Sequence, residues 1–307
     1  HSGAFVSSIS SNEPSVFGVI LDRTNFYAEQ GGQLFDTGIL SVTTSDGKTI
    51  ELEVLSVKTR AGYVLHVCQF KQDDSIGKGE KQISLGNSVT CSFDLERRKG
   101  LRQNHTATHL LNFAIRSVCT DEQDPEQKGS YVAPDKLRFD FCRNKPVDCE
   151  QLSRIQQLVN EMIQQDLPVY AKDVSLQEAS KITGIRMVFG ESYPDPVRVV
   201  SIGINVDKLV SEPENPQWLN YAIELCGGTH SLSIGELERF VITQETTKAK
   251  GTRRIFAITG SCAMESEVFE KLLQERLDDL DLFFKAESLK LTEHPSSTDL
   301  SVLSSSI

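Results

Sequence analysis

Two pairs of metal-binding residue types, each with its members four positions apart, constrain this chain more than any other feature. His105 and His109 lie in a run whose apolar residues predict a helix, so both imidazoles are expected on one face of it. Cys226 and His230 flank a Gly-Gly-Thr turn, and glycine lets the backbone bring two such side chains together. Three imidazoles and one thiolate are a ligand set suited to zinc. The sequence therefore predicts a fold that gathers both pairs around one Zn²⁺ ion.

A single His-x-x-x-His pair also has an ordinary interpretation, because it can arise by chance and lie on a solvated helix face. The second pair makes coincidence a poor explanation, since the chain has 6 histidines and 7 cysteines among 307 residues. A zincin protease helix is excluded, because that motif needs glutamate directly after the first histidine and Thr106 stands here. Four protein ligands favour a zinc that is structural or holds substrate, whereas an open position would let it activate water. The sequence leaves both roles open.

Composition limits the class of protein. A chain of 307 residues with 38% hydrophobic content can bury a sizeable core and is expected to hold two domains. The apolar runs are too short to span a membrane, and the first residues lack the pattern of a secretory signal. The 7 cysteines, with no Cys-x-x-Cys, indicate reduced thiols and predict a cytoplasmic location. A net charge of −11 disfavours indiscriminate binding to nucleic acid but permits a local basic patch.

The N-terminal part of the chain, residues 15–99, has the pattern of an all-β domain. Short runs rich in β-branched and aromatic residues alternate there with Gly and Asp turn signals. These runs are residues 16–21, 50–54, 62–67 and 89–93. Their lengths and spacing predict a small β-barrel.

A glycine-containing segment, residues 26–38, separates the first two of these runs. It holds the adjacent glycines Gly31 and Gly32, followed by Asp36 and Gly38. Glycine permits unusual backbone angles or close approach by another part of the chain. Spacing alone predicts a structural turn, while the polar, aromatic-flanked character of the segment leaves open a surface that faces a ligand.

The following part, residues 100–262, mixes helical and strand patterns. Beyond the histidine helix, a helix is predicted over residues 152–167, ended by Pro168, and another starts at the capping box of residues 175–178. Strands are predicted over residues 137–141, 197–202, 240–242 and 255–258. This is an α+β pattern, with helices packed on a mainly antiparallel sheet. One long amphipathic helix is predicted over residues 263–291, and the Ser/Thr-rich residues 292–307 are predicted to be disordered.

Several short motifs occur in a fixed order along the chain. They are Asn-His-Thr-Ala-Thr-His at residues 104–109, Gln-Lys-Gly-Ser at 127–130, Leu-Arg-Phe-Asp at 137–140 and Cys-Gly-Gly-Thr-His at 226–230. The combination resembles the editing domain of alanyl-tRNA synthetases of the eukaryotic type and of the free-standing AlaX editing proteins. Residues 26–33 resemble the glycine motif of the β-barrel that precedes that domain. Because no aminoacylation core precedes these motifs, an excised fragment or a stand-alone editing protein is expected.

The resemblance implies hydrolysis of tRNA(Ala) mischarged with serine or glycine, while correct Ala-tRNA(Ala) is spared. Such a second check is useful, because an alanine pocket cannot exclude glycine by size and rejects the serine hydroxyl only ~10²-fold. The family's working residues fall on Thr108 and Gln127. The Thr108 hydroxyl would pair with the serine side chain, unless it bonds back to a carbonyl one turn earlier. The Gln127 amide would orient the ester or the water, unless it is simply exposed.

Two basic clusters are predicted to contact tRNA phosphates, although each could also be an ordinary solvated surface. Their members are Arg97, Arg98 and Lys99, and Lys248, Lys250, Arg253 and Arg254. The β-barrel would then present the acceptor end of tRNA(Ala) to the zinc site. The alternative function, from a different class, is a non-catalytic module that binds RNA or a protein partner and contains a structural zinc.

Overall fold

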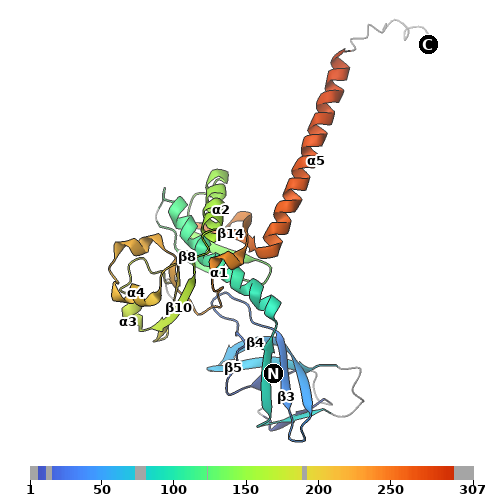
Figure 1. The fold of residues 1–307 in the computed structure, drawn as a ribbon, viewed down its shortest axis with the longest axis vertical. Helices are drawn as coiled ribbons and strands as arrows, with labels where there is room; N and C mark the ends of the chain where they lie inside the picture. Colours follow the sequence, from blue (N-terminus) through green and yellow to red (C-terminus); the bar gives the residue numbers. More distant parts are fainter. Residues whose placement is uncertain (1–5, 12–15, 73–80, 123, 189–191, 294–307) are drawn as a thin grey trace, which may run out of the picture. The chain divides into compact units, whose positions relative to one another are not determined.

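An antiparallel sheet forms the N-terminal part of the computed structural model, which describes residues 6–11, 16–72, 81–122, 124–188 and 192–293 (Figure 1). Its strand order is β2 (Phe17–Ile20), β5 (Tyr63–Phe70), β4 (Thr49–Arg60), β3 (Gly38–Thr43) and β7 (Ser88–Phe93). A two-stranded ladder pairs β1 (Ser8–Ser10) with β6 (Gln82–Ser84). The pairings among the described residues leave β2 and β7 at the edges of the sheet, so a closed barrel stays a prediction.

The helix α1 (Leu95–Val118) is the central element of the part of the chain that follows, and it carries the histidine pair. It packs with α2 (Cys149–Ile163) against a sheet of order β13 (Phe240–Ala249), β14 (Thr252–Thr259), β9 (Leu137–Cys142) and β8 (Gln127–Val132). The core between these layers is fully buried and aliphatic or aromatic. It includes Leu110, Leu111, Phe139, Ile155 and Phe240. Burial of this apolar face explains why the sequence predicts α1, α2, β9, β13 and β14, although it does not predict β8.

A smaller sheet leads to the second metal-binding pair. Its order is β10 (Val169–Val174), β11 (Val197–Ile202) and β12 (Ile223–Leu225), all antiparallel. A separate core packs on this sheet around the buried Trp218. The remaining short elements here are α3 (Leu176–Ala179), α4 (Val206–Ser211) and the 3₁₀ helices η1 (Pro216–Asn220) and η2 (Ile234–Leu237). Because β12 ends at Leu225, the Cys226–His230 turn begins at a fixed position at the end of a sheet.

Several element boundaries differ from those predicted, most clearly at the ends of helices. The basic residues 95–100 lie inside the first turns of α1, because Asp94 is its N-cap and accepts a hydrogen bond from the Arg97 backbone nitrogen. The helix α2 ends at Ile163 rather than at residue 167, and Asp166 has a left-handed φ of 46° that prevents continuation. The helix that starts at the Ser175 capping box, α3, is a single turn.

The long C-terminal helix, α5, runs Gly260–Glu293, close to its predicted bounds. The described residues up to Ala263 form one compact unit, and those from Met264 form another. The apolar residues of the second unit, such as Leu272 and Leu280, are exposed. The predicted disordered tail, residues 292–307, lies outside the described residues from position 294. Among the described helices, none combines the length and the apolar composition that a membrane span requires.

Candidate metal centre

The four predicted metal ligands converge on one point. His105 and His109 face the same side of α1, one turn apart and each 4% exposed, and the turn after β12 brings Cys226 and His230 to them. One ligand atom from each of the four residues lies within 4.8 Å of the other three. The Cys226 sulfur is 3.3 Å from His105 Nε2 and 3.5 Å from His230 Nε2. The Nε2 atoms of His109 and His230 are 3.0 Å apart.

These separations suit a tetrahedral zinc site. Zinc-ligand bonds of about 2.0–2.1 Å to nitrogen and about 2.3 Å to sulfur place ligand atoms roughly 3.3–3.6 Å apart at the corners of a tetrahedron. The measured sulfur–nitrogen distances of 3.3 and 3.5 Å match this spacing. The other pairs of ligand atoms, including the His109 and His230 nitrogens at 3.0 Å, lie within 4.8 Å of each other, and small side-chain rotations would bring them to the tetrahedral spacing. The donor set and its geometry therefore fit Zn²⁺.

The charges around Cys226 favour the thiolate form that binds a metal. Burial would raise the pKa of the Cys226 thiol, but His105, His109 and His230 outweigh it and hold that pKa well below its usual value. Burial likewise opposes protonation of His109, yet the charges of Glu224 and Cys226 raise its pKa to about 10. Burial lowers the pKa of His230 to about 3. A thiolate paired with an imidazolium results, and binding of a metal would release the proton.

Two further residues hold the ligands in place, and neither was predicted as a site residue. The Glu224 carboxylate lies 2.7 Å from His109 Nδ1 and accepts a hydrogen bond of 2.8 Å from the Asn112 amide. The Gln33 side chain, from the glycine-containing loop, lies 2.6 Å from His105 Nδ1. Acceptors of this kind orient metal-binding imidazoles. Glu224 lies two residues before Cys226 in the sequence, whereas Gln33 becomes a candidate only through the fold.

The centre opens into a large cavity of about 1550 Å³. The walls of this cavity include Thr108 and Gln127, the two residues predicted to act on substrate. Thr108 is 4% exposed, and its hydroxyl donates a hydrogen bond of 2.8 Å to the carbonyl oxygen of Asn104. Gln127 is the first residue of β8, so its placement in a loop before a strand was wrong. The structure brings both residues to the cavity that His105, His109 and Cys226 also line.

Comparisons with known proteins identify the families to which this chain is related. Residues 197–256 match the family described as the threonyl and alanyl tRNA synthetase second additional domain, and residues 1–97 match the class II (A) tRNA synthetases. The chain is 46% identical over 275 residues to an alanine–tRNA ligase of Candida albicans, aligned over 89% of the chain and 27% of the relative. It is also 42% identical over 265 residues to the cytoplasmic alanine–tRNA ligase of Dictyostelium discoideum, and this alignment covers 86% of the chain and 27% of the relative.

The chain contains an editing domain of the alanyl-tRNA synthetase type. The mitochondrial alanine–tRNA ligase of Rattus norvegicus is 39% identical over 259 residues, which are 84% of the chain and 25% of that relative. The chain thus spans about a quarter of the length of the curated relatives it matches, 27% and 25% in these cases. Because relatives are described as cytoplasmic and as mitochondrial, the cytoplasmic location of this editing domain stays a prediction.

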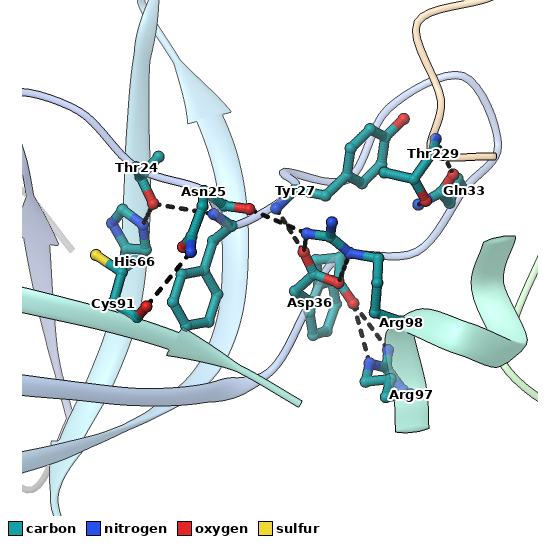
Figure 2. A network of polar contacts seen from close by, with 12 residues as sticks. Thr24, Asn25, Tyr27, Gln33, Asp36, His66, Cys91, Arg97, Arg98 and Thr229 are labelled. Carbon is teal, nitrogen blue, oxygen red and sulfur yellow. Dashed lines mark hydrogen bonds and ion pairs between the residues drawn. The ribbon is translucent and has the colours of Figure 1, made fainter. Parts of the chain in front are cut away.

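The upstream basic cluster of the editing domain has partners within the protein. Arg98 Nε donates a hydrogen bond of 2.8 Å to the buried carboxylate of Asp36 (Figure 2). The Arg98 guanidinium also lies 4.0 Å from the centre of the Phe93 ring. Arg97 donates hydrogen bonds of 3.1 and 3.0 Å to the carbonyl of Phe35. Lys99 pairs with Glu238 at 3.6 Å. These contacts tie α1 to the glycine-containing loop, and contact with tRNA stays a prediction.

The downstream cluster forms ion pairs with two carboxylates of the same fold. Lys248 and Arg254 donate hydrogen bonds of 2.9 and 2.7 Å to Asp140, which is fully buried. Arg253 is 8% exposed and pairs with Glu245 at 2.7 Å. Lys250, in contrast, lies exposed in the turn between β13 and β14. The fold thus accounts for the charges of Lys248, Arg253 and Arg254 without a bound phosphate.

Replacing Asp140 by asparagine is expected to lower the free energy of unfolding by about 1–3 kcal/mol at pH 7, because Lys248 and Arg254 lose a buried counter-charge but stay partly solvated. Burial raises the pKa of Asp140, but Arg254 and Lys248 outweigh it and lower that pKa. The ionised form therefore stabilises the parent above pH ~4, and this contribution is lost as pH falls through the lowered pKa. Urea unfolding of the parent and of Asp140→Asn at several pH values measures this contribution to the free energy of unfolding.

The exposed Asp135, which lies 3.7 Å from Lys136, provides the control substitution Asp135→Asn. Its stability is expected to match the parent at every pH. An Asp140→Asn variant as stable as the parent at pH 7 would show that the cluster does not depend on this carboxylate.

Proposed function

We propose that this editing domain hydrolyses the ester of tRNA(Ala) mischarged with serine or glycine, and spares Ala-tRNA(Ala). The observation that supports this most directly is the position of three of the four metal ligands, His105, His109 and Cys226, in the wall of a cavity that is also lined by Thr108 and Gln127. At about 1550 Å³, the cavity exceeds the ~300–1,000 Å³ of most small-molecule sites. It therefore has room for an amino acid together with the terminal nucleotide that carries it.

In this proposal His105, His109, Cys226 and His230 hold one Zn²⁺ ion. The bound ion would supply Lewis acidity, to activate water or to hold the amino group or the terminal ribose of the substrate. Water adds across the ester, which releases the amino acid as a carboxylate and restores the tRNA hydroxyl. Gln127 supplies an amide at the cavity wall that orients the ester or the water.

Thr108 supplies the discrimination between serine and alanine. Its hydroxyl proton is already donated to Asn104, so the oxygen is left to accept a hydrogen bond from the serine side chain. Alanine has no hydroxyl and would leave this buried oxygen without that partner. A site built around such a bond rejects the analogue that lacks it, because the unpaired polar group is costly. The hydrogen bond from the Thr108 hydroxyl to the Asn104 carbonyl oxygen thus determines that Thr108 accepts, rather than donates, the hydrogen bond to the substrate.

Replacing Thr108 by valine is expected to slow the hydrolysis of Ser-tRNA(Ala) by about 10–100-fold, since valine keeps the shape and removes a hydrogen bond worth roughly 1–3 kcal/mol. The rate on Ala-tRNA(Ala) should change little, so that the ratio of the two rates falls. Single-turnover deacylation of both aminoacyl-tRNAs measures that ratio. Thr108→Ser, which retains the hydroxyl, should keep most of it. A valine variant that discriminates as well as the parent would contradict this role for Thr108.

The same assay on the parent protein tests the proposed activity. Release of serine from preformed Ser-tRNA(Ala), with Ala-tRNA(Ala) left intact, is the expected result. If the zinc-loaded parent binds tRNA(Ala) but releases neither amino acid, the alternative holds and the chain is a non-catalytic RNA-binding module with a structural zinc.

A further inference from the structure

The buried side chain of Gln33 joins the N-terminal domain to the metal centre. Gln33 belongs to the loop between β2 and β3, yet it is 0% exposed and lies against residues more than 70 positions away. Its Oε1 atom is 2.6 Å from His105 Nδ1 and 2.9 Å from the backbone nitrogen of Thr229. Its Nε2 atom donates a hydrogen bond of 2.8 Å to the Thr229 hydroxyl (Figure 2). One amide therefore contacts both metal-binding segments.

These contacts determine which nitrogen of His105 carries a proton. The backbone nitrogen of Thr229 is always a donor, so the Gln33 atom that faces it must be the oxygen. That oxygen also faces His105 Nδ1, and an amide oxygen only accepts, so Nδ1 must be the protonated nitrogen. The lone pair of His105 is thereby left on Nε2, the atom that lies 3.3 Å from the Cys226 sulfur.

The loop that carries Gln33 is itself fixed at both ends. On one side Val132 N donates a hydrogen bond of 2.8 Å to Gly32 O, and a Cβ on Gly32 would lie 2.6 Å from Ser130 O. On the other side Asp36 is held by Arg98 of α1 and accepts a hydrogen bond of 2.6 Å from Tyr27 N (Figure 2). The helix that carries His105 is therefore tied to the loop that carries Gln33. Because the loop is held on both sides, the Gln33 side chain has a fixed position from which it can orient a metal ligand.

We propose that Gln33 is a positioning residue of the metal centre, which holds His105 as its Nδ1-protonated tautomer and ties it to the Cys226–His230 turn. The N-terminal domain then completes the site by supplying one of the acceptors that orient its ligands. This inference rests on the proposed zinc site. It relates the placement of the glycine-containing loop to the metal ligands rather than only to a surface that faces a ligand.

Metal binding by the full chain tests this role directly. Zinc affinity is measured by competition with a chromophoric chelator, and the ligand field by the visible spectrum of the Co²⁺-loaded protein. In Gln33→Leu, His105 loses its acceptor, so zinc affinity should fall by about 10–100-fold and the Co²⁺ bands should shift. Gln33→Glu keeps an acceptor for His105 and for Thr229 N, so its affinity and spectrum should stay close to those of the parent.

The control is Gln30→Leu, a substitution of the same type at an exposed position in the same loop, and parental metal binding is expected for it. Unchanged affinity and an unchanged Co²⁺ spectrum in Gln33→Leu would overturn the proposal, as would an equal loss in Gln30→Leu. If Gln33→Leu does not fold, the Co²⁺ spectrum of Gln33→Glu tests the proposal instead. A spectrum that differs from that of the parent would contradict the positioning role of Gln33. A parent chain that binds no zinc would instead refute the proposed zinc site itself.

Discussion

Replacing Cys226 by alanine is expected to remove tight zinc binding from this protein. Structural zinc sites contribute roughly 10–16 kcal/mol of apparent binding free energy, so one of four ligands carries about 3–4 kcal/mol. Because each ~1.4 kcal/mol is tenfold in affinity, the dissociation constant should rise by about 10²–10³-fold. Cys226 is also the only thiolate of the set, and its loss removes the negative charge that the three imidazoles share.

Metal analysis after dialysis against a chelator distinguishes the variants. The parent should retain one zinc per chain, and Cys226→Ala should retain almost none. The matched control is Cys149→Ala, because Cys149 is an exposed, free cysteine at the start of α2. Equal zinc content in the parent and in Cys226→Ala would remove Cys226 from the metal site.

The ligand set could be predicted from the sequence because each pair is local. The spacing of His105 and His109 on a helix, and of Cys226 and His230 around a glycine turn, determines most of their geometry before the fold forms. The apolar patterns likewise predict α2, β9, β11 and β14. Burial alternates strictly along β14, whereas β11 is buried on both faces over most of its length. These are the parts of the molecule in which local pattern and tertiary packing agree.

The residues that orient the ligands could not be predicted in this way. Gln33 meets His105 across 72 positions, and that contact depends on how the loop packs on β8. The strands β8 and β10 were missed because their short sequences, QKGSYV and VYAKDV, mix polar, charged and apolar residues without clear alternation. The start of α1 was misplaced because the charged residues 95–99 were assigned to the β domain and to a solvated surface, whereas Asp94 caps a helix that begins at Leu95.

The basic residues illustrate a related limit. A cluster of arginines and lysines in a sequence does not show which acidic side chains it will meet. Asp36 and Asp140 lie far from their partners in sequence, at separations of 62 and 114 positions, and both are fully buried. Charges that suggested a surface for RNA therefore have structural partners. A phosphate contact at Arg98 or Arg254 would have to share the guanidinium with an existing carboxylate.

Replacing Gly228 by alanine is expected to weaken zinc binding strongly, although it adds a single methyl group. A Cβ at this position would lie 2.0 Å from His105 Cε1 and 2.3 Å from His105 Nδ1, well inside van der Waals contact. The His105 ring cannot easily yield, because it is 4% exposed and held by Gln33, whose Oε1 would itself be 3.1 Å from the new carbon. Either His105 leaves its position or the turn that carries Cys226 and His230 moves away.

Both responses separate the two halves of the ligand set. The loss should resemble that of one ligand, about 10²–10³-fold in zinc affinity, and overpacking should cost the metal-free protein about 1–3 kcal/mol of unfolding free energy. The neighbouring glycine gives a matched control, because a Cβ on Gly227 would meet nothing within 4 Å. Chelator competition and urea unfolding of both variants measure the two effects. If Gly228→Ala bound zinc as tightly as Gly227→Ala, the close packing of the turn against His105 would not be needed to form the site.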